Sequence, residues 1–103
     1  MLFALIKYMI SEISITISNC MEVRFAGPDH EPEVMEKFDD NNILIRIIRN
    51  GLSELIECGM KFALEQPNGL RANGIISKVQ HQNGFVLTWC QMEPKSISTL
   101  KEV

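Results

Sequence analysis

The stretch from residue 41 to residue 66 carries the strongest periodic pattern in the sequence and constrains the fold more than any other segment. When its residues are placed at about 100° each, as in an α-helix, most apolar residues fall on one half of the cylinder. Asp39 and the residues after it offer N-caps, and Pro67 would stop the helix. The alternative is a strand over Ile43–Arg49 that breaks at Asn50-Gly51, which the isoleucines favour locally. The helical pattern covers more residues, so we predict one long helix over residues 41–66.

Residues 12–26 alternate between apolar and polar side chains, which is the pattern of a half-buried strand. A three-residue turn at residues 18–20 would fold this segment into a hairpin. The apolar residues would then meet in the pairs Ile17–Met21, Ile15–Val23 and Ile13–Phe25. One unbroken strand would also keep these residues on one face, because all of them have odd numbers. We favour the hairpin.

A second hairpin is predicted over residues 70–91, around the turn sequence Gln82-Asn83-Gly84. A three-residue loop with Gly84 in the left-handed conformation would give the pairs Val79–Leu87 and His81–Phe85. Ile75, Val79, Phe85, Leu87 and Trp89 would then share one face. A two-residue Asn-Gly loop would instead pair Gln80 with Leu87 and Lys78 with Trp89, and so mix polar with apolar side chains. We therefore expect the three-residue loop.

The remaining segments complete an α+β fold. Residues 31–38 could form a short helix with Pro32 in its first turn, and residues 94–103 resemble a short C-terminal helix. The chief predicted elements are thus two strands, a long helix, two strands and a short helix. This order is typical of a four-stranded antiparallel sheet, made of two hairpins, with helices on one face. A chain of 103 residues has the size of one domain, so we assign residues 1–103 to a single small α+β domain.

Charge and cysteine content narrow the class of protein. The net charge of −3 does not provide the positive field that draws a protein to nucleic acid, so we expect no nucleic-acid partner. Cys20, Cys58 and Cys90 are far apart and odd in number, which indicates reduced thiols in a reducing compartment. Met1–Ile6 is apolar but lacks the charge order of a secretory signal, and no apolar run reaches the length of about 18 residues that a membrane span needs. We expect a cytoplasmic protein without a membrane partner, and the sequence indicates no metal or cofactor.

Two groups of residues are candidates for ligand binding. Trp89, Phe85 and Phe62 could line an apolar pocket with some of the six methionines, and His81 shares the face of Trp89 in the predicted hairpin. Arg46 and Arg49 would project from the polar side of the long helix and could receive an anionic group. No catalytic residue is assigned, because the sequence contains no G-x-S-x-G elbow, P-loop or G-x-G-x-x-G motif. An enzymatic role would rely on His30 or His81 as a metal ligand or an acid–base group.

Two short stretches resemble known families. Cys58-Gly59-Met60-Lys61-Phe62, followed later by Asn83-Gly84-Phe85, resembles the C-terminal half of PilZ domains, which bind cyclic di-GMP. The R-x-x-x-R element of that family is absent, because Arg46 and Arg49 are separated by two residues, and its D/N-x-S-x-x-G element is absent too. Ile47–Ala63 resembles the N-box helix of histidine-kinase-type ATPases, but without the metal-holding asparagine and the glycine-rich lid. No residue role is carried over from either family.

The sequence favours a non-catalytic interaction or regulatory module that works as a homodimer. Met1–Ile10, the apolar side of the predicted long helix, and the strands near Ile75-Ile76 and Val86 carry more apolar residues than a core of this size needs. The first alternative is a small-molecule-binding domain with a pocket of aromatic and methionine side chains. The second is a small metal-dependent or acid–base enzyme.

Overall fold

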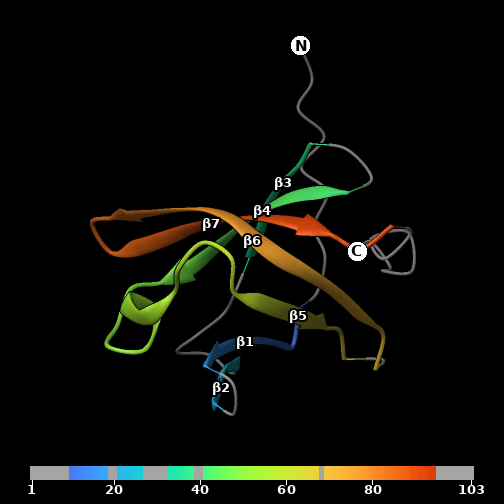
Figure 1. Cartoon of the computed structure of the whole chain (residues 1–103), viewed down its shortest axis with the longest axis horizontal. Coiled ribbons are helices and arrows are strands. Elements are labelled where there is room, and N and C mark those ends of the chain that lie inside the picture. Colours follow the sequence, from blue (N-terminus) through green and yellow to red (C-terminus); the bar gives the residue numbers. More distant parts are fainter. Residues whose placement is uncertain (1–9, 19–20, 27–32, 39–40, 68, 95–103) are drawn as a thin grey trace.

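The computed structural model describes residues 10–18, 21–26, 33–38, 41–67 and 69–94. Within these ranges the regular structure is almost entirely β-strand, and the one helical element is a single turn of 3-10 helix, η2 (Ser53–Leu55) (Figure 1). The strands are β1 (Glu12–Ser18), β2 (Met21–Ala26), β3 (Glu33–Lys37), β4 (Asn42–Ile48), β5 (Lys61–Glu65), β6 (Arg71–Gln82) and β7 (Phe85–Met92).

All seven strands belong to one sheet with the order β2-β1-β5-β6-β7-β4-β3, and every neighbouring pair is antiparallel. The consecutive strands β1–β2, β3–β4, β5–β6 and β6–β7 are antiparallel neighbours, whereas β4 and β5, which also follow each other in the chain, lie on opposite sides of β6 and β7. β6 is the longest strand, and it pairs with β5 in its first half and with β7 along most of its length.

One face of the sheet supplies the hydrophobic core. In β4 the side chains of Ile43, Ile45 and Ile47 are buried at 1% exposure each, as are the alternate residues of β7 from Val86 to Met92 at 3% or less. Buried residues from six of the strands form one cluster, so the sheet must curve around its own inner face (Figure 1). A curved sheet of this kind can enclose a core without a covering layer of helices.

The predicted α+β fold, with four strands and a long helix over residues 41–66, is wrong. These residues form β4, a turn containing η2, and β5. The β-branched isoleucines of β4 favour an extended chain, and alternate ones enter the core. The Oδ1 atom of Asn50 then accepts backbone hydrogen bonds at 2.9 Å from Leu52 and Ser53, which turns the chain. The structure therefore matches the alternative interpretation, a strand that breaks at Asn50-Gly51.

The first predicted hairpin is confirmed for most of its length. β1 pairs with β2 through Ile13–Phe25 and Ile15–Val23, as the alternation predicts. At the turn, however, the register shifts so that Met21 pairs with Ser18 instead of Ile17. Met21 is 46% exposed as a result and does not belong to the core.

The second hairpin forms, but with a different register from the predicted one. β6 and β7 are joined by the two-residue loop Asn83-Gly84, where Gly84 has φ +85°. Lys78 therefore pairs with Trp89, and Gln80 pairs with Leu87, which are the mixed pairs that the sequence analysis disfavours. The mixed pairs are acceptable because this side of the hairpin faces outward, where the Lys78 ammonium can lie over the Trp89 ring.

A register shift at Ser77 also changes which residues of β6 share a face. Before the shift, Ile76 faces the core and Ile75 is 51% exposed; after it, Val79 packs against the core. Val79 therefore does not share the face of Trp89, contrary to the prediction, whereas Ile75, which pairs with Gln91, lies on the same outer face as Trp89 as predicted. His81 pairs with Val86, so it is not on the Trp89 face either.

The predicted short helix over residues 31–38 is also replaced by a strand, β3. Its antiparallel pairing with β4 explains the extended conformation, because β4 offers backbone groups to a strand on that side. The predicted C-terminal helix over residues 94–103 lies outside the described residues except for Pro94, and the apolar start does so except for Ile10, which packs against the core.

Candidate binding surface

Three apolar side chains of β7 lie on the outer face of the sheet. Phe85, Leu87 and Trp89 alternate with the buried residues of the same strand and are half-buried themselves. On one side they lie opposite Ile48, Arg46 and Leu44 of β4, and on the other opposite Gln82, Gln80 and Lys78 of β6. We refer to the group Arg46, Lys78, Phe85, Leu87 and Trp89 as the aromatic–cation face.

A positively charged side chain lies over each aromatic ring of this face. The guanidinium carbon of Arg46 lies 4.4 Å from the centroid of the Phe85 ring, and the ammonium of Lys78 lies 4.6 Å from the ring of Trp89. A cation within about 6 Å of a ring is attracted to the negative face of its π-system. Because β4 and β6 flank β7, the two cations approach from opposite sides of that strand. The long aliphatic parts of Arg and Lys side chains also cover apolar surface while their charged ends stay in water.

Uncharged side chains border the aromatic–cation face on β6 and near the end of β7. Gln80, Gln82 and Gln91 are exposed beside it on β6 and β7. A hollow of about 350 Å³ adjoins Trp89, and Phe38, which is 49% exposed, contributes to its wall. The surface therefore combines aromatic groups, two positive charges and a border of neutral amides.

A second polar cluster lies where β4 ends and the β6–β7 hairpin turns. Arg49 donates a hydrogen bond and forms an ion pair through Nε with Glu54 of η2, and its Nη1 donates to the Gln82 carbonyl at 3.1 Å. His81 Nδ1 lies 3.4 Å from the other carboxylate oxygen of Glu54, and this contact becomes an ion pair when the imidazole is protonated. The hydrogen bond from Arg49 holds the pKa of Glu54 below its usual value, and the charges of Arg49 and His81 act in the same direction. These contacts attach the turn after β4 to the β6–β7 hairpin. The role of the cluster is therefore structural.

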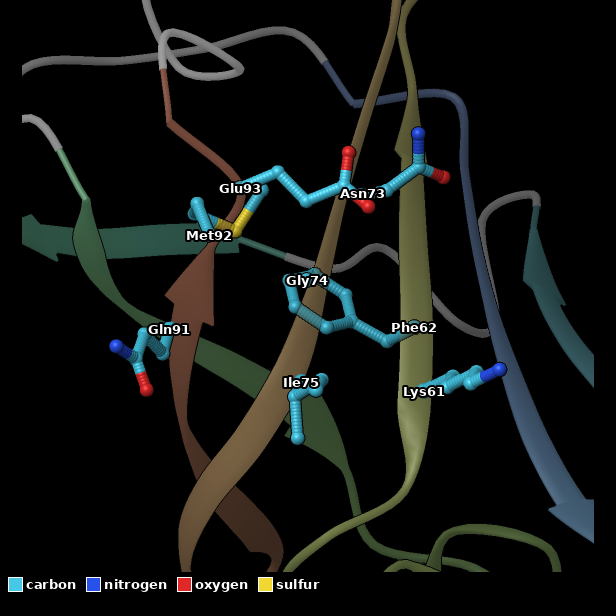
Figure 2. Close-up of a pocket in the computed structure, with 8 residues that line it drawn as sticks. All are labelled: Lys61, Phe62, Asn73, Gly74, Ile75, Gln91, Met92 and Glu93. Carbon is cyan, nitrogen blue, oxygen red and sulfur yellow. The ribbon is translucent and has the colours of Figure 1, made fainter.

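A groove of about 470 Å³ lies where β5, β6 and β7 meet (Figure 2). Figure 2 shows the ring of Phe62 reaching from β5 across Gly74 of β6. A Cβ atom at Gly74 would lie only 2.6 Å from the Phe62 ring, so the absence of a side chain there makes room for that ring. Ile75 and Met92 add apolar surface, while Lys61, Asn73, Gln91 and Glu93 add polar groups.

The structure brings together some of the residues that the sequence analysis named and separates others. Trp89, Phe85 and Arg46 lie on one face, although Arg46 is there as part of a strand instead of a helix. Arg49 and His81 both contact Glu54. Phe62 is 4% exposed and lines the groove away from Trp89 and Phe85, so these three aromatic residues do not form one pocket.

Lys78 and Gly74 were not predicted as site residues from the sequence. The position of Lys78 opposite Trp89 follows directly from the two-residue Asn-Gly loop, which sets the register of the hairpin. Lys78 was not named as a site residue because apolar residues were expected to pair only with apolar ones. The sequence around Gly74 does not show that a glycine is needed there, because the need arises from the close approach of Phe62 and of the neighbouring strand β7.

No metal centre stands out within the described ranges, and the buried thiol of Cys90 is a poor nucleophile. No group of three or more His, Cys, Asp or Glu side chains there could hold a metal ion. Burial strongly raises the pKa of the Cys90 thiol, which disfavours the nucleophilic thiolate. His30 and Cys20 lie outside these ranges. No helix in this part of the chain is long and apolar enough to cross a membrane.

Comparison with known proteins found no match among protein-family models, curated proteins or solved structures.

Proposed function

We propose that this protein is a non-catalytic interaction module and that it binds a protein partner through the aromatic–cation face. The observation that carries the proposal is that Phe85 and Trp89 both lie outside the core, each with a cation over its ring. The core on the opposite face is complete without them. Aromatic residues and arginine are enriched in protein interfaces and dominate their binding energy.

The surface indicates the chemistry of the partner. Apolar groups of the partner would pack against Leu87 and the exposed edges of the two rings. A carboxylate at the border of the contact would meet the ammonium of Lys78, which is on the exposed side of β6. We therefore expect a partner segment in which acidic residues flank apolar ones. The amides of Gln80 and Gln82 can supply hydrogen bonds at the rim.

Random peptides displayed on phage test this proposal, and the single tryptophan of the chain provides the readout. Selected peptides should carry Asp or Glu beside apolar residues and should shift the emission of Trp89 when titrated in solution. Lys78→Glu keeps the tryptophan but reverses the charge over its ring, and it should weaken binding by about tenfold or more.

Lys61→Glu is the matched control, because Lys61 is another exposed lysine on the outer side of the sheet but belongs to β5. It should bind the selected peptides as the wild type does. Equal binding by Lys78→Glu and wild type would contradict the proposal, as would peptides that bind without changing the emission of Trp89.

The groove in Figure 2 supports a second candidate function, the binding of a small molecule. Its volume of about 470 Å³ lies in the range of small-ligand sites, and it combines apolar surface with two charged and two amide side chains. A fragment screen by ligand-observed NMR tests this function. Fragments that bind the groove should lose affinity for Glu93→Arg and keep it for Lys78→Glu. If all hits bind both variants equally, the groove is not their site.

A further inference from the structure

Ile75 is an exposed apolar residue in the middle of the sheet. It belongs to β6, the central strand in the sheet order, and its exposure of 51% is the highest among the large apolar residues that the structure describes. The core does not use this side chain, because the next residue, Ile76, faces inward and is buried. On the outer face Ile75 lies opposite Lys61 of β5 and Gln91 of β7.

Ile75 also connects the aromatic–cation face with the groove of Figure 2. Gln91 and Trp89 point to the same side of β7, on either side of the buried Cys90, so Ile75 is the diagonal neighbour of Trp89. Such diagonal neighbours are about 7–8 Å apart, which is within reach of an aromatic side chain. Because Ile75 lines the groove as well, the groove and the aromatic–cation face are adjacent parts of one outer surface.

Glu93 places a negative charge at the other end of the groove. Its backbone N–H donates to the Asn73 carbonyl at 2.9 Å, so the chain stays beside β6 after β7 ends. Figure 2 shows the Glu93 side chain extending across β6, away from Ile75, whereas the ammonium of Lys61 points out of the groove toward β1. Among the described residues, no salt bridge joins Glu93 or Lys78 to another side chain, so a partner can meet both charges.

We propose that the partner site continues from the aromatic–cation face over Ile75 and ends at Glu93, and that it binds one polypeptide segment with an acidic group at one end and a basic group at the other. The acidic group of the segment meets Lys78, its apolar side chains cover Trp89 and Ile75, and its basic group meets Glu93. The inference rests on the proposed function and adds the direction in which the segment lies. The reverse direction would bring like charges together at both ends.

The distance between the two charges sets the length of the segment. Glu93 follows Trp89, the residue opposite Lys78, by four positions, which correspond to about 13 Å of extended chain. An extended segment covers this distance with about four residues, and a helix covers it with about nine. In either form the apolar residues lie between the two charges and above Trp89 and Ile75.

The peptides selected on phage also test this inference, again with the emission of Trp89 as the readout. They should carry a basic residue in addition to the acidic one. Glu93→Arg should weaken their binding by about tenfold, because it places two positive groups together. Ile75→Thr keeps a β-branched residue in β6 but removes apolar area from the contact, and it should weaken binding by about fivefold.

A change in the peptide tests the charge contact itself. A peptide whose basic residue is replaced by glutamate should bind the wild type weakly and should regain most of its affinity for Glu93→Arg. Glu22→Arg is the matched control, because it makes the same substitution at an exposed residue of β2, three strands away from β6. It should bind the original peptides as the wild type does, and circular dichroism would verify that each variant is folded.

The outcomes separate this inference from the proposed function. Peptides that lose affinity for Lys78→Glu but bind Glu93→Arg and Ile75→Thr as they bind the wild type would overturn the inference and leave the proposed function intact. Peptides that Lys78→Glu also binds normally would contradict both. Failure of the exchanged peptide to regain affinity for Glu93→Arg would refute the contact between Glu93 and the basic group.

Discussion

Replacing Gly74 by alanine tests the packing of β5, β6 and β7 directly. An added Cβ would lie 2.6 Å from the carbonyl oxygen of Gln91, 2.6 Å from Cε1 of Phe62 and 3.1 Å from Cα of Met92. Two of these three atoms belong to the backbone of β7, which cannot move without disturbing its pairing with β6. Gly74 does not have a left-handed φ, so the expected effect arises from lack of space and not from backbone strain.

The magnitude follows from two opposing effects. Forcing an extra carbon into a packed site costs about 1–3 kcal/mol, and contacts with backbone atoms place this site near the upper end. Alanine restricts the unfolded chain, which offsets about 0.4–1 kcal/mol of the cost. We therefore expect Gly74→Ala to lower the free energy of unfolding by about 2 kcal/mol. For a domain of this size the midpoint of thermal unfolding, Tm, should fall by about 8–16 °C.

Gly51→Ala is the control, because no atom lies within 4 Å of the corresponding Cβ and the φ of Gly51 is not left-handed. It should leave the stability unchanged or raise it by up to about 1 kcal/mol. Urea unfolding followed by circular dichroism and by Trp89 fluorescence would measure both variants, with the slope against urea checked for equality. Equal stability of the two variants would refute the close approach of β7 and Phe62 to Gly74.

Three further predictions concern single side chains. Thr88 Oγ1 has no hydrogen-bond partner among the described residues and is buried, so Thr88→Val should stabilise the protein by about 1 kcal/mol; a lower Tm would contradict this. Cys58 is exposed, whereas Cys90 is buried and its pKa is raised, so iodoacetamide should modify Cys58 faster than Cys90, as peptide mass spectrometry would show; equal rates at these two residues would count against the burial of Cys90. Arg49→Gln should return the lowered pKa of Glu54 toward its usual value in an NMR titration. Because that pKa is lowered in the folded state, the stabilisation is present above the usual carboxyl pKa and is lost as pH falls through the folded value; an unchanged titration of Glu54 would exclude this coupling.

Local patterns predicted the parts of the fold that depend on neighbouring residues. The first hairpin is an example, because the alternation of residues 12–26 and a short turn are enough to align Ile15 with Val23. The second hairpin was located correctly by Asn83-Gly84, but its register depends on which face is buried. Sequence reasoning chose to pair apolar residues with one another, and the structure instead places the apolar residues of β7 on an outer face beside Lys78.

The error over residues 41–66 has a different physical reason. The helical pattern counts apolar residues on one side of a single cylinder, but Asn50 divides this stretch into two segments. β4 then pairs with β3 and β7, while β5 pairs with β1 and β6. On one side each segment pairs with a strand that is distant in the sequence, β7 for β4 and β1 for β5, and no local pattern shows that such partners exist.

The candidate surface was predicted in part. Trp89, Phe85 and Arg46 were named from residue type, and the structure places them on one face. Their arrangement could not be predicted, because the contact between Arg46 and Phe85 joins β4 to β7, which are far apart in the sequence. The same limitation applies to Phe62, whose predicted partners lie elsewhere.

The sequence by itself determined the alternation of the first hairpin and the turn position at Asn83-Gly84, because these follow from backbone preferences of adjacent residues. It offered the break at Asn50-Gly51 only as the alternative to a long helix. Only the tertiary structure decided the strand order, the outward direction of Trp89 and the need for Gly74. These features depend on which strands become neighbours in the sheet. Strand pairing minimises the free energy of the whole chain, and alternation in one segment does not specify the partner that the segment will find.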